Sequence, residues 1–166
     1  MHFHSRFQAG RMLASRLTKK YTNNDCVVVA LDEGGVIVGS EIAKQLHCDL
    51  VMINNSNIDL FLDSLTVDKT KVDNRNIILT SDGLGSSLKL DLALPSLRGY
   101  KKLIMAVPLA SIRVVNWMHI NADEIYCLSV VENYTNNKNY YDNNDVPTSD
   151  MLVKSLNIKI LTRQAN

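Results

Sequence analysis

Apolar residues fall into short continuous runs along this chain, and these runs do not alternate with polar residues. The clearest run is Cys26–Leu31, which is rich in β-branched side chains. A run of this kind is typical of a strand that is covered on both faces, as in a parallel sheet. Further strands are predicted on the same grounds at Leu50–Ile53, Ile77–Leu79, Leu103–Val107 and Glu124–Val131. Pro108 is expected to end the fourth strand, because proline cannot donate to a ladder.

The stretches between these runs have the spacing of amphipathic helices. The first, Phe7–Leu17, carries its apolar residues at helical intervals, with charged residues off that stripe. Further helices are predicted at Val36–Leu46, Ser86–Leu97, Ser111–His119 and, capped by Ser149, Ser149–Ile160. Residues 133–144 are expected to form a loop. Residues 54–75 are ambiguous, with a hairpin around 60–67 as one interpretation.

Alternation of strands and helices predicts an α/β fold, with a doubly wound, mostly parallel, Rossmann-type sheet flanked by helices. The chain has 166 residues, of which 46% are hydrophobic. This is enough for one proper core and too little for two, so residues 1–166 are expected to form a single domain. Ligands of such sheets bind beyond the carboxyl ends of the strands. A binding site is therefore expected where the predicted strands end.

Two glycine-containing turns fall at that edge. One is Asp32-Glu33-Gly34-Gly35, after the first strand, and the other is Ser81-Asp82-Gly83-Leu84-Gly85-Ser86-Ser87, after the third. Backbone N–H groups and serine hydroxyls in such turns can hold an anion, so a phosphate site is a natural hypothesis. The alternative is that small residues are needed in any strand-to-helix turn. In that view Asp82 and the serines cap a helix, and Asp32 and Glu33 form a solvated turn.

Charge and cysteine content restrict the possible partners. The formal net charge is +1, so no long-range field favours nucleic acid or an anionic membrane. Cys26, Cys48 and Cys127 lie in or beside apolar stretches and are interpreted as reduced thiols of a cytoplasmic protein. The four histidines lack metal-ligand spacing, and no metal site is expected. The first residues lack an apolar signal core, and no run approaches the length of a membrane span.

Three segments taken together resemble the type I phosphoribosyltransferases, in particular a small bacterial branch. They are Phe3–Ala14, Val29–Val36 and Thr80–Leu84, with Ala106-Val107-Pro108 and Tyr140-Tyr141 as further similarities. The resemblance implies a parallel sheet, phosphoribosyl pyrophosphate with Mg²⁺ as donor, and displacement at the anomeric carbon of ribose. It also implies that Asp82 is the catalytic, ribose-binding residue and that residues 81–87 hold the 5′-phosphate. Residues 32–35 would correspond to the pyrophosphate turn.

This chain departs from the pattern of that family where charge matters most. The family has two adjacent acidic residues where Ser81-Asp82 stands, and Lys89 replaces the last threonine of its phosphate loop. Asp32-Glu33 stands where the family has Pro-Arg, which reverses the sign of charge beside a pyrophosphate. Two unit charges about 4 Å apart interact by about 4 kcal/mol near a protein surface. A site changed in this way is expected to bind the donor poorly and to accelerate transfer little.

Three functions remain open from the sequence. The favoured one is a phosphoribosyltransferase-like protein that binds a nucleotide or phosphorylated ribose with little or no transferase activity. The second is an active enzyme that uses phosphoribosyl pyrophosphate, Mg²⁺ and a small base-like acceptor, in which Asp32 and Glu33 recruit the metal. The third is a scaffold that keeps only the fold. A homodimer is a further expectation from the resemblance, and the acceptor base is not indicated.

Overall fold

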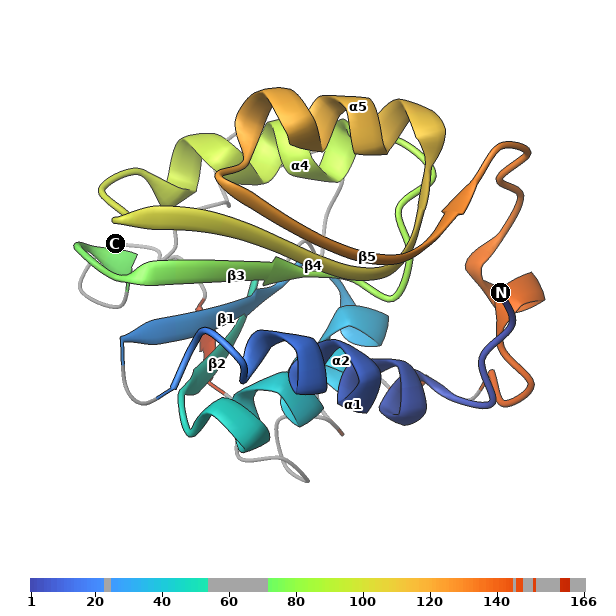
Figure 1. Ribbon diagram of the computed structural model, residues 1–166, viewed down its shortest axis with the longest axis horizontal. Coiled ribbons are helices and arrows are strands. Elements are labelled where there is room, and N and C mark those ends of the chain that lie inside the picture. The colour runs from blue at the N-terminus through green and yellow to red at the C-terminus, as the bar shows by residue number, and fades with distance from the viewer. Residues whose placement is uncertain (23–24, 54–71, 145, 148–150, 152–158, 162–166) are drawn as a thin grey trace.

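A six-stranded parallel sheet organises the molecule (Figure 1). The computed structural model describes residues 1–22, 25–53, 72–144, 146–147, 151 and 159–161. The strands are β1 (Cys26–Ala30), β2 (Asp49–Ile53), β3 (Asn76–Thr80), β4 (Lys102–Ser111), β5 (Glu124–Val131) and β6 (Lys159–Leu161). Their order is β5-β4-β3-β1-β2-β6, and every neighbouring pair is parallel. The predicted α/β class and parallel sheet are confirmed.

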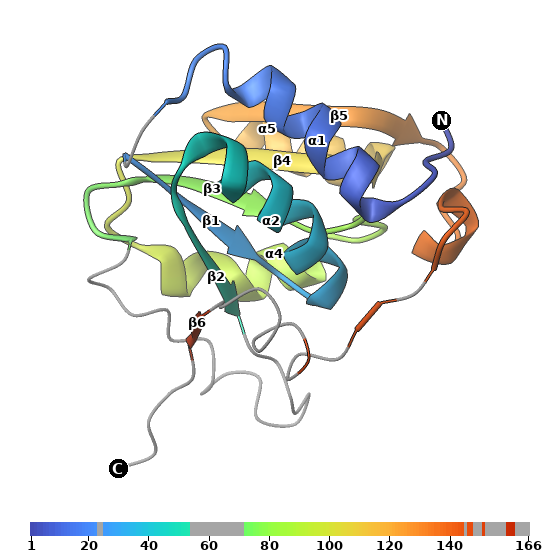
Figure 2. The ribbon, with the colours of Figure 1, turned by 90° about the horizontal axis from the view of Figure 1, so that it is seen from below.

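Helices cover both faces of this sheet. They are α1 (Arg6–Leu17), α2 (Glu33–Leu46), α4 (Leu88–Ala93) and α5 (Ile112–Asn121), with 3₁₀ turns η2 (Leu94–Leu97) and η3 (Asn137–Tyr140). Helices α1 and α2 lie on one face, and α4 and α5 lie on the other (Figures 1 and 2). The 134–144 segment that contains η3 lies beyond the carboxyl ends of the strands, beside the N-terminus. The arrangement is the three-layered one that alternating strands and helices predict.

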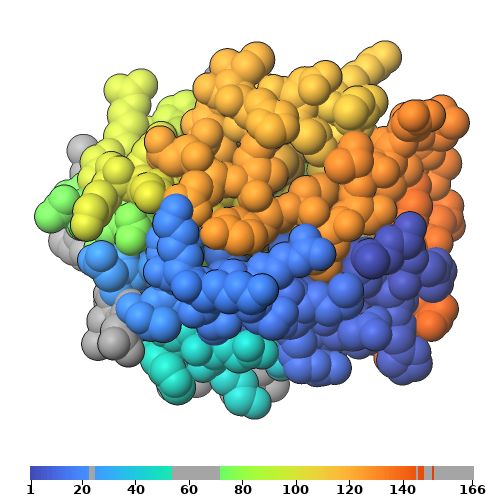
Figure 3. Space-filling model, viewed as in Figure 1, coloured from blue at the N-terminus to red at the C-terminus, as the bar shows by residue number. Residues whose placement is uncertain are grey.

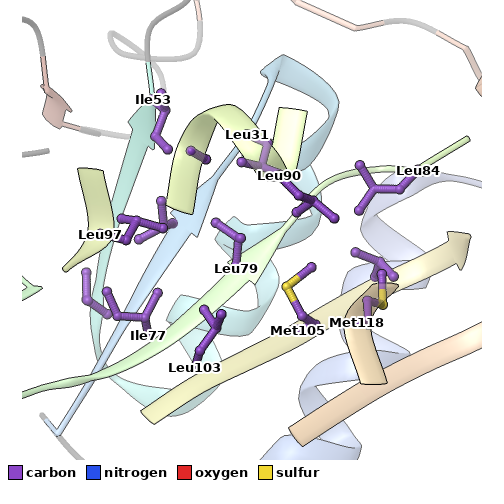
Figure 4. Close-up of a cluster of buried hydrophobic side chains, with 14 of the residues drawn as sticks. Leu31, Ile53, Ile77, Leu79, Leu84, Leu90, Leu97, Leu103, Met105 and Met118 are labelled. Carbon is purple, nitrogen blue, oxygen red and sulfur yellow. The ribbon is translucent and has the colours of Figure 1, made fainter. Parts of the chain in front are cut away.

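The hydrophobic core is split by the sheet into two layers. Val27 and Val29 of β1 face the layer under α4 and α5, and Val28 between them faces the layer under α1 and α2. All five residues of β1 are buried. Figure 4 shows the first layer, where Leu79 of β3 and Met105 of β4 lie near Leu90 of α4. Burial on both faces explains why the strands appear in the sequence as unbroken apolar runs.

Several predicted boundaries differ from the structure. Pro108 does not end its strand, because β4 continues to Ser111; the register with β5 omits Pro108 and resumes at Leu109. The predicted helix Ser86–Leu97 consists of α4 and the 3₁₀ turn η2, where Pro95 lies near the start of the turn. The end of the predicted helix Ser149–Ile160 is instead part of strand β6.

Other predictions fall outside the described residues. These are the hairpin at 60–67 and most of the helix from Ser149 onward. The predicted loop at 133–144 is irregular apart from η3. In the described part of the chain, no helix is both long and apolar enough to span a membrane.

Glu124, the first residue of β5, is hydrogen-bonded to two lysines. Its Oε1 atom accepts hydrogen bonds from Lys20 and from Lys102, the latter at 3.0 Å, and its side chain is 18% exposed. Burial acts to raise the pKa of Glu124, but the hydrogen bonds outweigh it and lower the pKa to about 2. A carboxyl group whose pKa is lower in the folded state stabilises the protein at pH values above its unfolded pKa.

We therefore expect the free energy of unfolding to fall as the pH decreases from about 4.5 to about 2. Because both lysines are partly exposed, the contribution of Glu124 is expected to be only about 1 kcal/mol. Urea denaturation of wild type and Glu124→Gln across this pH range measures it. The variant should be less stable at pH 6 and nearly equal at pH 2. A constant difference between the two proteins would contradict this assignment.

Candidate functional site

The two glycine turns lie side by side at the carboxyl ends of β1 and β3. These strands are neighbours in the sheet, and the Leu31 N–H donates to the Thr80 carbonyl oxygen at 3.0 Å. A Cβ atom added to Gly34 would lie only 2.3 Å from the Asp82 carboxyl carbon. The Ser81 hydroxyl donates to Asp32 Oδ2 at 2.8 Å. The expectation that both turns share one edge of the sheet is therefore confirmed.

The first turn is the beginning of helix α2. Asp32 is its N-cap: Oδ1 accepts from the Gly35 N–H at 2.7 Å, and the helix begins at Glu33 rather than at Val36 as predicted. Asp32 Oδ2 accepts from Ser81 and from Lys89 Nζ, the latter at 2.7 Å. The interpretation of Asp32 as part of a solvated turn is therefore wrong. Both of its oxygens have protein partners, and one partner is a cation.

Asp82 is buried, and both of its carboxylate oxygens accept hydrogen bonds. Its Oδ2 atom accepts from Arg6 Nε at 2.7 Å, and the two side chains are 7% and 4% exposed. Oδ1 accepts from Asn137 Nδ2 at 2.6 Å, and the main-chain oxygen accepts from the Tyr141 hydroxyl. The Arg6 guanidinium also lies 4.4 Å from the centre of the Tyr141 ring. These contacts join β3, α1 and the 134–144 segment at one point.

Tyr134 and Asn137 are two site residues that were not predicted from the sequence; Arg6 and Thr135 are others. The Tyr134 hydroxyl donates to Asn137 Oδ1, and Asn137 Nδ2 also donates to the Gly83 carbonyl oxygen at 3.2 Å. A Cβ atom on Gly83 would lie 2.4 Å from the Tyr134 hydroxyl oxygen, and one on Gly85 would lie 2.7 Å from its ring. The glycines of the second turn therefore allow Tyr134 to pack directly on the backbone.

A pocket of about 330 Å³ opens between the second turn and this tyrosine. Its lining residues are Gly83, Leu84, Gly85, Ser86, Lys89, Tyr134, Thr135 and Asn137. Four of the residues predicted to hold phosphate therefore contribute to it. Ser81 and Ser87 do not line it: Ser81 is buried and donates to Asp32, and the Ser87 hydroxyl donates to Asp91 at 2.9 Å. The Leu84 N–H donates to the Leu109 carbonyl oxygen at 3.1 Å.

Polar groups at the mouth of the pocket suit an anionic ligand. Gly85, Ser86 and Lys89 are exposed lining residues. Ser86 supplies a hydroxyl group, and Lys89 supplies an ammonium group. Burial opposes the charged form of Lys89, but the negative charge and hydrogen bond of Asp32 dominate and raise the pKa of Lys89. Lys89 is therefore cationic at neutral pH, and a phosphate group is a chemically suitable partner for it.

The charges beneath the pocket interact with one another. Burial and the nearby charge of Asp32 raise the pKa of Asp82, while Arg6 and Asn137 act in the opposite direction. Burial and the charge of Asp82 also raise the pKa of Tyr134, so its hydroxyl stays protonated. Among the described residues, no cluster of three or more His, Cys, Asp or Glu side chains could hold a metal ion.

N-terminal residues hold the 134–144 segment at the carboxyl ends of the strands, and the two segments lie in contact in Figure 3. Phe3 pairs with Tyr141 through the backbone, and their rings stack at 5.6 Å between centroids. Asp142 Oδ1 lies 2.7 Å from His2 Nε2, and Oδ2 lies 3.3 Å from His4 Nδ1. Hydrogen bonds from His2 and His4 lower the pKa of Asp142. The N-terminal residues therefore contribute Arg6 to the site and hold the 134–144 segment in place.

No protein-family model matches the chain. At the level of sequence, no curated protein matches it significantly. Solved structures do match its shape.

The protein TT1426 from Thermus thermophilus has a TM-score of 0.74 and 20% identity, over 94% of this chain and 97% of that one. A hypoxanthine phosphoribosyltransferase from Staphylococcus aureus has a TM-score of 0.53 and 17% identity, over 78% and 75%. A hypothetical protein from Neisseria gonorrhoeae, solved with bound ppGpp, has a TM-score of 0.53 and 12% identity, over 95% and 97%. The chain therefore has a phosphoribosyltransferase-like fold.

Proposed function

We propose that this protein binds a small phosphorylated ligand, a nucleotide or phosphorylated ribose, in the pocket beside Ser86 and Lys89. We further propose that it catalyses little or no phosphoribosyl transfer. The ligand's phosphate would lie at the exposed end of the pocket, against the hydroxyl of Ser86 and the ammonium of Lys89. The similar Neisseria gonorrhoeae protein holds a phosphorylated nucleotide, which supports this class of ligand.

One observation carries the second half of the proposal: the cations at this edge are already paired with carboxylates. Lys89 lies 2.7 Å from Asp32, and Arg6 lies 2.7 Å from Asp82 beneath the pocket. Transfer from phosphoribosyl pyrophosphate requires positioned positive charge around the departing pyrophosphate. Asp32 and Glu33 at the first turn add negative charge instead. The Lys89 ammonium has three donors and uses one on Asp32, so a single phosphate can still bind to it. A pyrophosphate leaving group, which carries more charge, finds no further cation among these residues besides the buried Arg6.

The alternative is an active, Mg²⁺-dependent enzyme in which Asp32 and Glu33 recruit the metal. Mg²⁺ prefers carboxylate oxygens, but it requires ligands that are free to coordinate it. Both Asp32 oxygens accept hydrogen bonds from the protein, one of them from the Lys89 ammonium. A metal ion at Oδ2 would have to displace Ser81 or Lys89, and at either oxygen it would lie close to the Lys89 ammonium, which repels it. For this reason we favour the non-catalytic function.

Calorimetry and a pyrophosphate-release assay separate the three functions. Wild-type protein is titrated with guanosine monophosphate and with phosphoribosyl pyrophosphate plus Mg²⁺, and release is measured with hypoxanthine and guanine as acceptors. Binding of the monophosphate without detectable pyrophosphate release supports the proposal. Steady release of pyrophosphate would establish the enzyme instead. Absence of binding by every phosphorylated compound would favour a scaffold.

Replacement of Lys89 by Ala is expected to weaken monophosphate binding by about tenfold to a hundredfold, because a charge-assisted hydrogen bond is lost. Lys101→Ala is the matched control, since Lys101 lies next to the amino end of β4 and is paired with Asp25 at the surface. Its affinity should equal that of wild type. Equal affinity in Lys89→Ala would show that the phosphate binds elsewhere.

A further inference from the structure

The resemblance to phosphoribosyltransferases implies that Asp82 would bind ribose, but here the Asp82 carboxylate is held by the protein's own side chains. Asp82 Oδ2 is held by Arg6 at 2.7 Å, and Oδ1 is held by Asn137 at 2.6 Å. The Asp82 side chain is 7% exposed. Each oxygen keeps a second lone pair, but Arg6 and Asn137 cover the carboxylate, so a sugar hydroxyl could reach it only by moving one of these side chains.

Neither partner is free to move aside. Arg6 is 4% exposed and stacks on the ring of Tyr141, whose hydroxyl group in turn holds the main chain of Asp82. Asn137 is fixed at both ends of its amide, because Oδ1 accepts from Tyr134 and Nδ2 reaches both Asp82 and Gly83. Displacing Asn137 would therefore also break its hydrogen bonds with Tyr134 and Gly83. Loss of partners at a buried carboxylate is strongly unfavourable.

We propose that this pocket selects its ligand by the phosphate group and not by the vicinal hydroxyls of ribose, because Arg6 and Asn137 occupy the Asp82 carboxylate. The inference rests on the proposed function, and it widens the ligand class from nucleotides and phosphorylated riboses to phosphate monoesters in general. Asn137 is the specificity-determining residue in this arrangement: its amide lies in the pocket lining and covers the oxygen that a sugar would use. Arg6 is a positioning residue, since it is buried and acts through Asp82.

The test compares two ligands on wild-type protein, guanosine 5′-monophosphate and its 2′,3′-dideoxy counterpart. A hydrogen bond to a buried carboxylate normally changes affinity by roughly tenfold to a hundredfold. We expect the two dissociation constants to agree within about threefold, which is a smaller change in affinity than the loss of one such hydrogen bond would cause. A preference of tenfold or more for the ribonucleotide would overturn it. Failure of both compounds to bind would contradict the proposed function itself.

A second measurement does not depend on affinity. In NMR spectra, the side-chain amide of Asn137 is assigned by comparison with Asn137→Ser, and its protons are followed during titration with guanosine monophosphate. The proposal expects both protons to remain protected from exchange with solvent at saturation, because the amide stays bonded to Asp82 and Gly83. Loss of that protection on binding would show that the ligand displaces Asn137, and would overturn the inference.

Discussion

Replacement of Arg6 by Met is expected to lower the free energy of unfolding by about 3 to 5 kcal/mol, the usual effect of removing one partner of a buried ion pair. Arg6 and Asp82 are 4% and 7% exposed, so water cannot take the place of the guanidinium. Methionine keeps most of the side-chain volume and leaves Asp82 as an uncompensated buried charge. Urea denaturation followed by circular dichroism at pH 7 measures the loss.

Two further variants show whether the loss comes from charge. Arg11→Met changes an arginine on the same helix that is 55% exposed and 3.9 Å from Glu41, and it should cost less than about 1 kcal/mol. The double variant Arg6→Met, Asp82→Asn leaves no unpaired charge and should recover at least half of the loss. A loss below about 1 kcal/mol in Arg6→Met would mean that the ion pair does not hold this site together.

Gly34→Ala is expected to destabilise the protein by about 2 kcal/mol, within the range known for overpacked sites. The new methyl group would lie 2.3 Å from both Cγ and Oδ2 of Asp82. Asp82 cannot move away without breaking its bonds to Arg6 and Asn137. Alanine gains up to about 1 kcal/mol from helix propensity, which the clash must exceed. The measured quantity is again the free energy of unfolding in urea.

Gln45→Ala is the control for this substitution. Gln45 lies on the exposed side of the same helix, α2, and its replacement should change stability by less than about 0.5 kcal/mol. A stability of Gly34→Ala equal to that of wild type would contradict the close packing of the two turns. It would also indicate that the Asp82 side chain has more freedom than its contacts allow.

Most of the fold follows from the pattern of the sequence. A strand buried on both faces is largely apolar, and β1 and the central residues of β3 and β4 have this character. The carboxyl ends of parallel strands meet at one edge, so both glycine turns could be placed at that edge from the order of the elements. Their direct contact depends on β1 and β3 being neighbours, which only the structure shows. Pro108 misled the prediction because pairing with β5 continues on both sides of it.

Less of the site could be predicted. Asp32 appeared to be a solvated charge because its partners, Ser81 and Lys89, lie 49 and 57 positions away in the sequence. Asn137 was one asparagine among many in a polar segment, and only the folded chain brings it to Asp82. A weak signal was present in Tyr134, an aromatic residue shortly after a strand end. Small residues such as Gly83 and Gly85 indicate close approach but do not identify the group that approaches.

The most direct test of the central claim is a crystal structure of the protein with guanosine monophosphate bound. We expect the phosphate within hydrogen-bonding distance of Lys89 Nζ and the Ser86 hydroxyl, in the pocket under Tyr134. We also expect the bonds from Arg6 and Asn137 to Asp82 to remain intact. A ribose whose hydroxyls bind Asp82 in place of Asn137, or a nucleotide bound away from Lys89, would contradict the account.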